Sequence, residues 1–310
     1  MFFWKLPPLF LNGKMLFMPE LPEVETIVRD LKKKIIGRTI KAVWFDAPKL
    51  IKPSAKNLQK IKGLKIEDIK RRAKNILIYL SDKKLLLIHQ KLTGHLLYGK
   101  WKIKKIQNSK FKVQSLLKGP LEEVVNNYIH LILYLDNGWQ MALSDLRKFA
   151  KILFGSQEEI ENLEEIKKLG PEPLEKSFDF KKFKEAITRK SGKIKQVLMD
   201  QNVIAGIGNI YSDEILWEAK IHPFRTVKSL SEDDLKKIFW SLKKNLNEAL
   251  RLRGTSVSDY RDPAGKKGYY EVRRRVYQRE GEKCRRCSAL IKRVKIAGRS
   301  AHFCPKCQKI

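Results

Sequence analysis

The chain has 310 residues, enough for two domains, and 43% of them are hydrophobic, so it can bury sizeable cores. Its 66 lysines and arginines against 34 aspartates and glutamates give a formal net charge of +32, which favours a polyanionic partner such as DNA without separating an enzyme from a binding module. No apolar run approaches the ~20 residues of a membrane-spanning helix, and no GxGxxG or phosphate-loop motif is present, so neither a membrane nor a nucleotide cofactor is expected.

The first 17 residues, MFFWKLPPLFLNGKMLF, are apolar but do not resemble a secretory signal. Pro7 and Pro8 interrupt the apolar run, and no small-residue cleavage site follows. Met18 precedes Pro19, and an initiator methionine is normally removed before proline. We therefore expect the native protein to begin at Pro19, without residues 1–17.

Residues 19–38 are expected to form one helix, with a proline in its first turn and a glycine at its end. The following stretch, residues 39–155, has several short strands separated by turn residues, which predicts a sandwich or barrel. The Asn137-Gly138 pair predicts a hairpin turn, and weak periodicity over 103–127 predicts a long loop or insertion. The strand candidates are Lys41–Phe45, Ile76–Leu80, Leu85–His89, Ile129–Leu135 and Trp139–Leu143.

Composition changes near residue 156. A helix is expected over Gln157–Lys168, and the LGPEPL run that follows cannot continue it, so this run is the expected interdomain linker. Residues 255–271 are rich in glycine and charge, which predicts a mobile loop. Helices dominate the segment between linker and loop, at Phe180–Lys190, Ile194–Gln201, Asn209–Ala219 and Ser231–Arg251.

The four cysteines form two pairs, Cys284-x2-Cys287 and Cys304-x2-Cys307, separated by sixteen residues. This spacing is typical of a tetrahedral four-thiolate zinc site in a reducing compartment, and a site closed by four ligands is structural. One zinc ion is therefore the expected cofactor. His302 could compete as a ligand, although four cysteines already complete the set. Zinc ribbons also serve as protein-binding modules, so this site alone does not establish an enzyme.

A free N-terminal proline at position 19 would be a reactive amine. An α-amino group has a pKa of ~7.7–8.0 against ~10.4 for lysine, so much of it is neutral near pH 7. Attack of a secondary amine on a sugar C1′ gives a cationic iminium, an electron sink that makes elimination of the neighbouring phosphates feasible. Glu20 is placed to donate a proton. An ordinary helix start also explains these residue types.

The run PELPEVE, residues 19–25, together with the features below, resembles the formamidopyrimidine-DNA glycosylase family over residues 18–308. The resemblance implies that Pro19 is the Schiff-base nucleophile, Glu20 the proton donor and Glu23 a further active-site carboxylate. The related endonuclease VIII group typically has glycine where Leu21 stands, so Leu21 favours the branch that repairs purines.

Two basic residues match further catalytic positions of this family. Lys74, in the run RRAKN before a strand, matches the lysine that contacts substrate phosphate and assists β-elimination. Arg299, five residues before Cys304, matches the zinc-hairpin arginine that grips phosphate and is assigned to δ-elimination. Solvated surface residues are the alternative for each of them taken alone.

Other positions match residues that contact DNA in the family. Leu92 stands where methionine is usual and would fill the space that the extruded base leaves. The run SDLRKF resembles the family's DPRRFG loop, in which Arg147 would bond the orphaned base and Phe149 would wedge beside it. Leu146 and Ala150 replace the usual proline and glycine, which puts the detailed shape of this loop in doubt.

The remaining expected DNA contacts are basic or polar. Tyr128 stands where the family often has a DNA-contacting histidine, whereas the neighbouring His130 is expected to be buried. Lys190 and Lys195 match basic positions. Asn209, in QVLMDQNVIAGIGNIY, begins a helix after a Gly-rich turn of the helix–two-turn–helix element and would contact the phosphate at the lesion.

The resemblance implies an α+β fold of two domains. An N-terminal helix plus β-sandwich is followed by a helical helix–two-turn–helix domain with a β-hairpin zinc finger. The expected divisions are a leader at 1–17, the catalytic sandwich at 18–155, a hinged linker at 156–178, the DNA-binding domain at 179–275 and the zinc finger at 276–310.

The function implied is a bifunctional DNA glycosylase/AP lyase of base excision repair, a monomer in the bacterial cytoplasm. It would excise oxidised purines, 8-oxoguanine and formamidopyrimidines, from damaged double-stranded DNA by β,δ-elimination through the proline Schiff base. Two alternatives stay open. One is an endonuclease VIII-like glycosylase for oxidised pyrimidines. The other is a non-catalytic zinc-ribbon DNA-binding protein, because Pro19 is an unreactive amide if residues 1–17 are retained.

Overall fold

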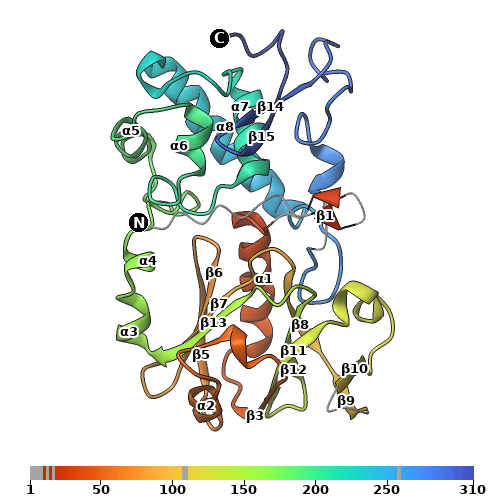
Figure 1. Cartoon of the computed structure of the whole chain (residues 1–310). Coiled ribbons are helices and arrows are strands. Elements are labelled where there is room, and N and C mark those ends of the chain that lie inside the picture. The colour runs from red at the N-terminus through yellow and green to blue at the C-terminus, as the bar shows by residue number, and fades with distance from the viewer. Residues whose placement is uncertain (1–9, 12–13, 16–17, 107–110, 257–259) are drawn as a thin grey trace.

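The structure is a computed structural model that describes residues 10–11, 14–15, 18–106, 111–256 and 260–310. The chain forms an N-terminal and a C-terminal lobe, with the start of helix α1 (Leu21–Ile35) at their junction (Figure 1). Of the expected leader, the structure describes only a pair of two-residue strands, β1 (Phe10–Leu11) and β2 (Lys14–Met15). Among the described residues, no helix is both long and apolar enough for a membrane span.

The N-terminal lobe is a β-sandwich, as expected. A four-stranded sheet has the order β3-β11-β12-β8, and a five-stranded sheet has the order β4-β13-β7-β6-β5. Apolar side chains of both sheets and of α1 meet in one core, which includes Val24, Ile78 and Leu133. The strands are β3 (Ile40–Phe45), β4 (Ile51–Lys52), β5 (Ile66–Arg72), β6 (Asn75–Leu80), β7 (Lys84–His89), β8 (Gly94–Gly99), β11 (Ile129–Leu135), β12 (Gln140–Asp145) and β13 (Lys151–Ser156).

Short elements fill the connections of this lobe and its linker. The expected helix over 157–168 is wrong as a single element, because Asn162 ends α3 (Gln157–Glu161) and α4 (Glu164–Lys167) starts anew. The other short elements are η1 (Pro48–Leu50), α2 (Ala55–Leu58), η2 (Gln59–Ile61), η3 (Pro120–Glu122) and η4 (Val124–Asn126).

The segment expected as a loop over 103–127 contains regular structure wherever it is described. Strands β9 (Trp101–Lys105) and β10 (Phe111–Ser115) pair antiparallel, and residues 107–110 between them lie outside the described residues. Trp101 and Leu121 are buried against the outer face of the four-stranded sheet. Lysines alternate with Trp101 and Ile103 in β9, which is the pattern of a half-buried strand, but with two apolar residues the pattern is too short to stand out in the sequence.

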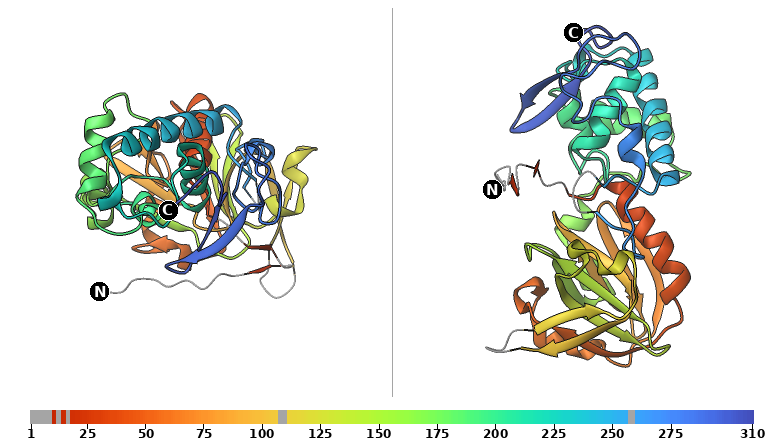
Figure 2. Two further views of the ribbon diagram at one scale, coloured as in Figure 1. Left: turned by 90° about the horizontal axis from the view of Figure 1, so that it is seen from above. Right: turned by 90° about the vertical axis from the view of Figure 1, so that its right-hand side faces the viewer.

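The C-terminal lobe is helical and ends in a β-hairpin, visible in blue in Figure 2. Its apolar core joins all four helices, as Phe183, Leu198, Tyr211 and Leu242 illustrate. The helix–two-turn–helix and hairpin architecture is confirmed. The elements are α5 (Phe180–Thr188), α6 (Ile194–Met199), α7 (Asn209–Ala219), η5 (Val227–Ser229), α8 (Glu232–Arg251), η6 (Tyr270–Arg273), β14 (Lys292–Ile296) and β15 (Arg299–Phe303).

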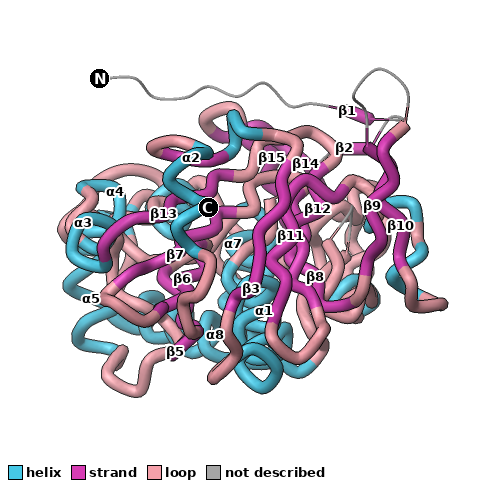
Figure 3. The backbone as a smooth tube through the Cα atoms, turned by 90° about the horizontal axis from the view of Figure 1, so that it is seen from below, coloured by secondary structure: helices cyan, strands magenta, loops and turns pink. Residues whose placement is uncertain are grey.

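Figure 3, a view from below, shows the strands of the sandwich in magenta and the helices in cyan. The mobile loop expected over 255–271 includes residues 257–259, which lie outside the described residues. The remainder of this loop contacts the N-terminal lobe through a hydrogen bond from the Tyr98 N–H to the Pro263 carbonyl.

Candidate active site

Glu20 lies at the junction of the two lobes and caps helix α7 from a distance of 188 residues in sequence. Its carboxylate accepts hydrogen bonds from the backbone N–H groups of Gly208 (2.8 Å), Ile210 (2.8 Å) and Tyr211 (3.3 Å). These donors form the positive end of the helix and stabilise an anion there. Burial nevertheless raises the pKa of Glu20, and Lys74 and the three N–H groups partly offset that rise. A carboxyl with a raised pKa is suited to proton donation.

Gly208 is required for this contact. A Cβ at this position would lie 2.4 Å from the Glu20 carboxyl carbon and from one of its oxygens, closer than any side chain tolerates. The Gly-rich turn therefore brings the backbone N–H groups within reach of Glu20, which explains the glycine that sequence alone left as a weak motif.

Glu23 is buried one helical turn beyond Glu20 and binds residues of both lobes. Its carboxylate accepts from the Tyr211 hydroxyl at 2.6 Å, the Thr255 N–H at 2.7 Å and the Glu20 N–H at 2.9 Å. Burial raises the pKa of Glu23 to about 7, and the adjacent Glu20 carboxylate adds to the rise against these hydrogen bonds. The sequence analysis did not predict Tyr211 and Thr255 as hydrogen-bond donors to Glu23. Only the position of Tyr211 in the run GNIY hinted at it.

Lys74 lies at the tip of the β5–β6 hairpin, which the linker between the lobes holds in place. Glu172 of the linker accepts a hydrogen bond from the Ala73 N–H at 2.6 Å and forms ion pairs with Arg71 and Arg72. Ala73 has a positive φ of 53°, so the turn is tight. Glu172 was missed from sequence, because its partners lie about a hundred residues away in the chain.

The half-buried Lys74 ammonium group interacts electrostatically with Glu20, Glu23 and Arg299. Burial lowers the pKa of Lys74, and the charge of Arg299 lowers it further, whereas the two glutamates raise it. The structure thus brings Lys74, Glu20 and Glu23 together with Arg299 of the zinc hairpin. Pro19 is buried beside Glu20. A lysine of lowered pKa is suited to proton transfer, and the basic pair is suited to binding phosphate.

The predicted DNA-reading loop is built on the buried carboxylate of Asp145. Asp145 accepts from the backbone N–H groups of Phe149 (2.7 Å), Ala150 (2.8 Å) and Arg147 (3.3 Å), and from the Thr93 hydroxyl. The Arg147 N–H also donates to the Thr93 hydroxyl at 3.2 Å, so this loop and the β7–β8 loop are joined. The conformation that Leu146 and Ala150 put in doubt is therefore held by Asp145.

The side chains of these loops contact one another but leave hydrogen-bonding groups free of protein partners among the described residues. The Arg147 guanidinium stacks on Phe149 at 4.5 Å, and Phe149 is partly exposed. Arg147 Nη1 is buried and has no hydrogen-bond partner among the described residues. A buried guanidinium nitrogen without a partner is costly, and this one keeps a donor free for an acceptor outside the described residues. Leu92 is half-buried in the adjoining loop, next to Thr93.

The other expected DNA contacts occupy different environments. Tyr128 is half-buried at the start of β11, and His130 is buried beside Asp46 at 2.7 Å, as expected. Lys190 is exposed and pairs with Asp200 at 3.5 Å. The Asn209 amide, at the start of α7, donates to the Ser300 hydroxyl at 3.2 Å.

Lys195 is not the surface lysine that its expected role suggested. Its side chain is 1% exposed, and its ammonium group donates to Asp213 at 2.6 Å and to the Ser300 carbonyl at 2.5 Å. Asp213 also accepts from His302, through its backbone N–H at 2.9 Å and its ring. This buried network joins α6, α7 and β15. The expected phosphate contact of Lys195 stays a prediction.

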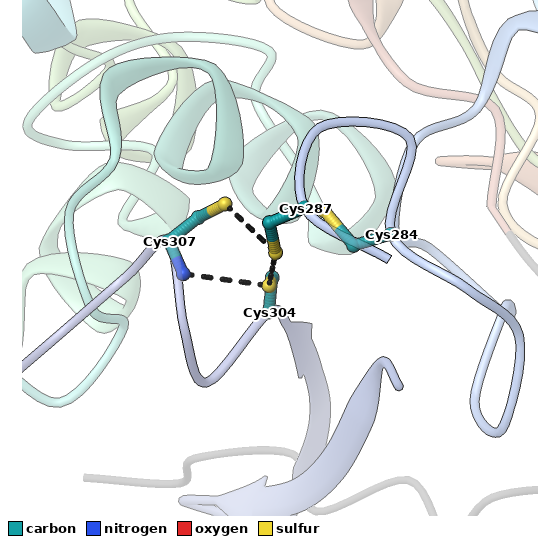
Figure 4. Close-up of side chains that lie close together, drawn as sticks. All are labelled: Cys284, Cys287, Cys304 and Cys307. Atoms are coloured by element: carbon teal, nitrogen blue, oxygen red, sulfur yellow. Dashed lines mark hydrogen bonds between the residues drawn. The ribbon is translucent and has the colours of Figure 1, made fainter. Parts of the chain in front are cut away.

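The four cysteines converge at the base of the hairpin, as Figure 4 shows. Their sulfurs all lie within 4.8 Å of one another, a spacing that fits the ~2.3 Å zinc–sulfur bonds of a tetrahedral site. The Trp217 indole donates to the sulfur of Cys284 at 3.4 Å, as groups around metal thiolates commonly do. His302 is outside the cluster and bonds Asp213 instead, so the geometry of the described residues is consistent with the four-cysteine ligand set that the spacing predicts.

Three family models cover most of the chain. The formamidopyrimidine-DNA glycosylase N-terminal domain matches residues 18–152, its H2TH domain matches 169–261, and the zinc finger found in FPG and IleRS matches 281–310. The formamidopyrimidine-DNA glycosylase of Heliobacterium modesticaldum is 36% identical over 94% of this chain and 100% of its own. The chain belongs to the formamidopyrimidine-DNA glycosylase family. It is a DNA glycosylase of base excision repair with one structural zinc.

Solved structures of the family share this fold. A complex of the Lactococcus lactis FPG (MutM) with a Fapy-dG containing DNA is 33% identical and has a TM-score of 0.78, covering 94% of this chain and 100% of that one. A MutM complex with carbocyclic 8-oxo-G containing DNA has the same identity and coverage and a TM-score of 0.79. Members of this family are glycosylase/AP lyases.

Proposed function

We propose that the enzyme excises oxidised purines from duplex DNA through the amine of Pro19 and then cuts the strand by β,δ-elimination. The observation that carries the proposal is the convergence of two buried carboxyls and two basic groups beside Pro19, from both lobes. Leu21 favours this substrate class over oxidised pyrimidines. The related complexes hold purine lesions in some cases and an oxidised pyrimidine in another, so they fit both classes.

In the proposed reaction the base is first extruded from the stack, because it is otherwise out of reach. The Pro19 nitrogen forms a bond to C1′, the bond from C1′ to the base breaks, and Glu20 supplies a proton as the sugar ring opens. The cationic iminium accepts the electron pair released when a proton is removed from C2′, and the 3′ phosphate leaves. Removal of a C4′ proton then releases the 5′ phosphate.

The roles proposed for the basic groups come from the family resemblance, and their positions near Glu20 support them. Lys74 would bind the lesion phosphate and move protons during β-elimination, and Arg299 would bind phosphate during δ-elimination. Leu92, Arg147 and Phe149 would fill the gap in the duplex. Tyr128, Lys190, Lys195 and Asn209 remain proposed DNA contacts, and Glu23 would hold the Glu20 backbone through its carboxylate. We place this enzyme in the bacterial cytoplasm as a monomer that needs no nucleotide cofactor.

The proposed chemistry requires Pro19 to be the N-terminal residue. The family match starts at residue 18, in keeping with an initiator Met18 that is removed. We therefore propose that residues 1–17 are absent from the native enzyme. The domain divisions at 18–155, 156–178, 179–275 and 276–310 are proposed with it.

Borohydride trapping tests this proposal. Borohydride reduces the iminium, so it should yield a covalent protein–DNA adduct on 8-oxoguanine duplex and on abasic DNA. Peptide mass spectrometry should place the adduct on Pro19, with no residue before it. An adduct on a lysine would refute the nucleophile assignment. A chain that retains residues 1–17 and traps nothing would instead be a non-catalytic DNA-binding protein, and trapping only on an oxidised pyrimidine would replace the substrate class.

A salt titration of DNA binding should distinguish residues that contact the base from residues that contact phosphate. Arg147→Ala should weaken binding to a lesion duplex more than to undamaged DNA, because its partner base is exposed only after extrusion. Its hydrogen bonds to that base are worth on the order of 1–3 kcal/mol. Lys190→Ala and Arg299→Ala should weaken both duplexes by similar factors and flatten the salt slope by about one unit. Equal losses on both duplexes for Arg147→Ala would make it another phosphate contact.

A further inference from the structure

The segment that follows α8 crosses from the C-terminal lobe and lies on the N-terminal lobe. In Figure 1 it is the blue loop that descends beside the yellow η3–η4 turns, residues 120–126. Its described part, Tyr260–Gly268, is here called the docked segment. The Tyr98 N–H of strand β8 donates to the Pro263 carbonyl at 2.7 Å, so the segment is fixed to the four-stranded sheet.

Gly265 fits closely against the η3–η4 turns. It has a positive φ of +79°, and a Cβ there would lie 3.0 Å from both the Asn126 amide nitrogen and the Pro120 carbonyl. The fully buried Asn126 amide donates to the Pro120 carbonyl at 2.7 Å and approaches the Gly265 carbonyl at 3.5 Å. The backbone conformation and the close approach both require glycine, which indicates a built contact between segment and turns.

An ion pair joins the same two elements. One carboxylate oxygen of Glu123, between η3 and η4, accepts from Arg261 Nη2 at 2.9 Å and Nε at 3.1 Å. Arg261 is only 4% exposed, whereas the Glu123 side chain is 42% exposed. A guanidinium removed from water needs an anionic partner, and Glu123 is the carboxylate that contacts it. Arg261 Nη1 also donates to the Tyr260 carbonyl at 2.9 Å, which transmits the position of the pair to the segment's backbone.

The docked segment reaches the active-site carboxyl Glu23. The buried Tyr260 hydroxyl lies 3.4 Å from the Glu23 carbonyl. Just before the segment, the Thr255 N–H donates to the Glu23 carboxylate, and a Cβ on Gly254 would lie 2.7 Å from that carboxylate. A displacement of the segment would therefore change what surrounds Glu23, beside which an extruded base would have to lie.

We infer that Glu123, acting through Arg261, is a positioning residue for base excision: it holds the docked segment against Glu23 so that a damaged base is received there. The inference rests on the proposed function. It gives the η3–η4 turns a role in choosing the base. An abasic site brings no base to this place, so its cleavage does not need the pair.

The test compares two activities of the full-length native enzyme. Glu123→Gln removes the charge that partners Arg261 but keeps an oxygen that can accept its hydrogen bonds, so the variant should stay folded with a melting temperature lowered by only a few degrees. It should slow single-turnover excision of 8-oxoguanine about tenfold, which corresponds to ~1.4 kcal/mol, and change cleavage of an abasic duplex by less than about twofold. Glu67→Gln, on an exposed residue of β5, makes the same change in net charge and should affect neither activity.

A double-mutant cycle with Arg261→Gln identifies the route. If Glu123 acts through Arg261, the double variant should excise no more slowly than Arg261→Gln alone. Equal losses of excision and abasic cleavage, no loss of excision, or an undiminished effect of Glu123→Gln in the Arg261→Gln background would each overturn the inference. These results are distinct from failure of the proposed function, in which the wild-type enzyme itself excises no oxidised purine.

Discussion

Glu20→Gln is expected to lower the rate of 8-oxoguanine excision by about 10²–10⁴-fold, the range that general acid catalysis contributes. The amide has nearly the same shape and keeps one oxygen that can accept from the start of α7, but its NH2 group cannot accept and it has no acidic proton to give to the opening sugar. Cleavage of an abasic site, which has no base to release and an already opened sugar, should fall by less than about tenfold. Single-turnover assays on the two substrates provide the comparison.

The pH dependence offers an internal check. Because burial raises the pKa of Glu20, the protonated acid persists to higher pH than for an exposed glutamate, and excision should decline as pH rises through that raised pKa. Glu20→Gln should lack this alkaline decline, because the amide does not titrate. A variant that keeps the wild-type profile, or that loses both activities equally, would show that Glu20 acts as a structural cap of α7 and not as the acid.

Local sequence patterns predicted much of the fold. Helix α7 begins and ends where its Gly-rich start and apolar content predict, and β11 spans the predicted apolar run before the Asn137-Gly138 turn. Strand β9 was missed, because only two apolar residues, Trp101 and Ile103, carry its alternating pattern and two lysines follow them. A sequence pattern over a few residues predicts local structure only. A short strand that is mostly exposed has few apolar residues, so its pattern is weak.

The site was predictable only in part for a different physical reason. The cysteine pairs and the PELPEVE run are local, and they identified the zinc ligands and the proposed nucleophile. Tyr211, Glu172 and Asp213 act through partners that are distant in the chain or on another element, and no spacing in the sequence reveals those contacts. For Lys195 the same limit applied: its charge suggested DNA, while the fold supplies Asp213 as its partner.

Removal of zinc is expected to lower affinity for lesion DNA by at least about 100-fold, because structural zinc contributes folding free energy and the hairpin carries phosphate-binding charge. Cys304→Ser should have the same effect. It leaves three cysteine ligands and removes the zinc attachment at the end of β15. Added zinc should restore binding after chelation and should not restore Cys304→Ser. Anisotropy with a stable abasic-analogue duplex measures the affinity, metal analysis measures the zinc content, and the exposed Ser288→Ala, within the same module, is the control.

The size of this effect follows from how the hairpin is attached. Cys304 continues directly from β15, on which Arg299 interacts electrostatically with Lys74 and the Ser300 carbonyl accepts from Lys195. Asp213 binds Lys195 and the His302 backbone at the same time, so the hairpin is fixed to α6 and α7 at one end and to the metal at the other. If the Asp213 network alone held Arg299 in place, the zinc-free enzyme would keep tight binding. That result would assign the orientation of the hairpin to the buried lysine–aspartate pair and leave the zinc with a role in the stability of the last turn only.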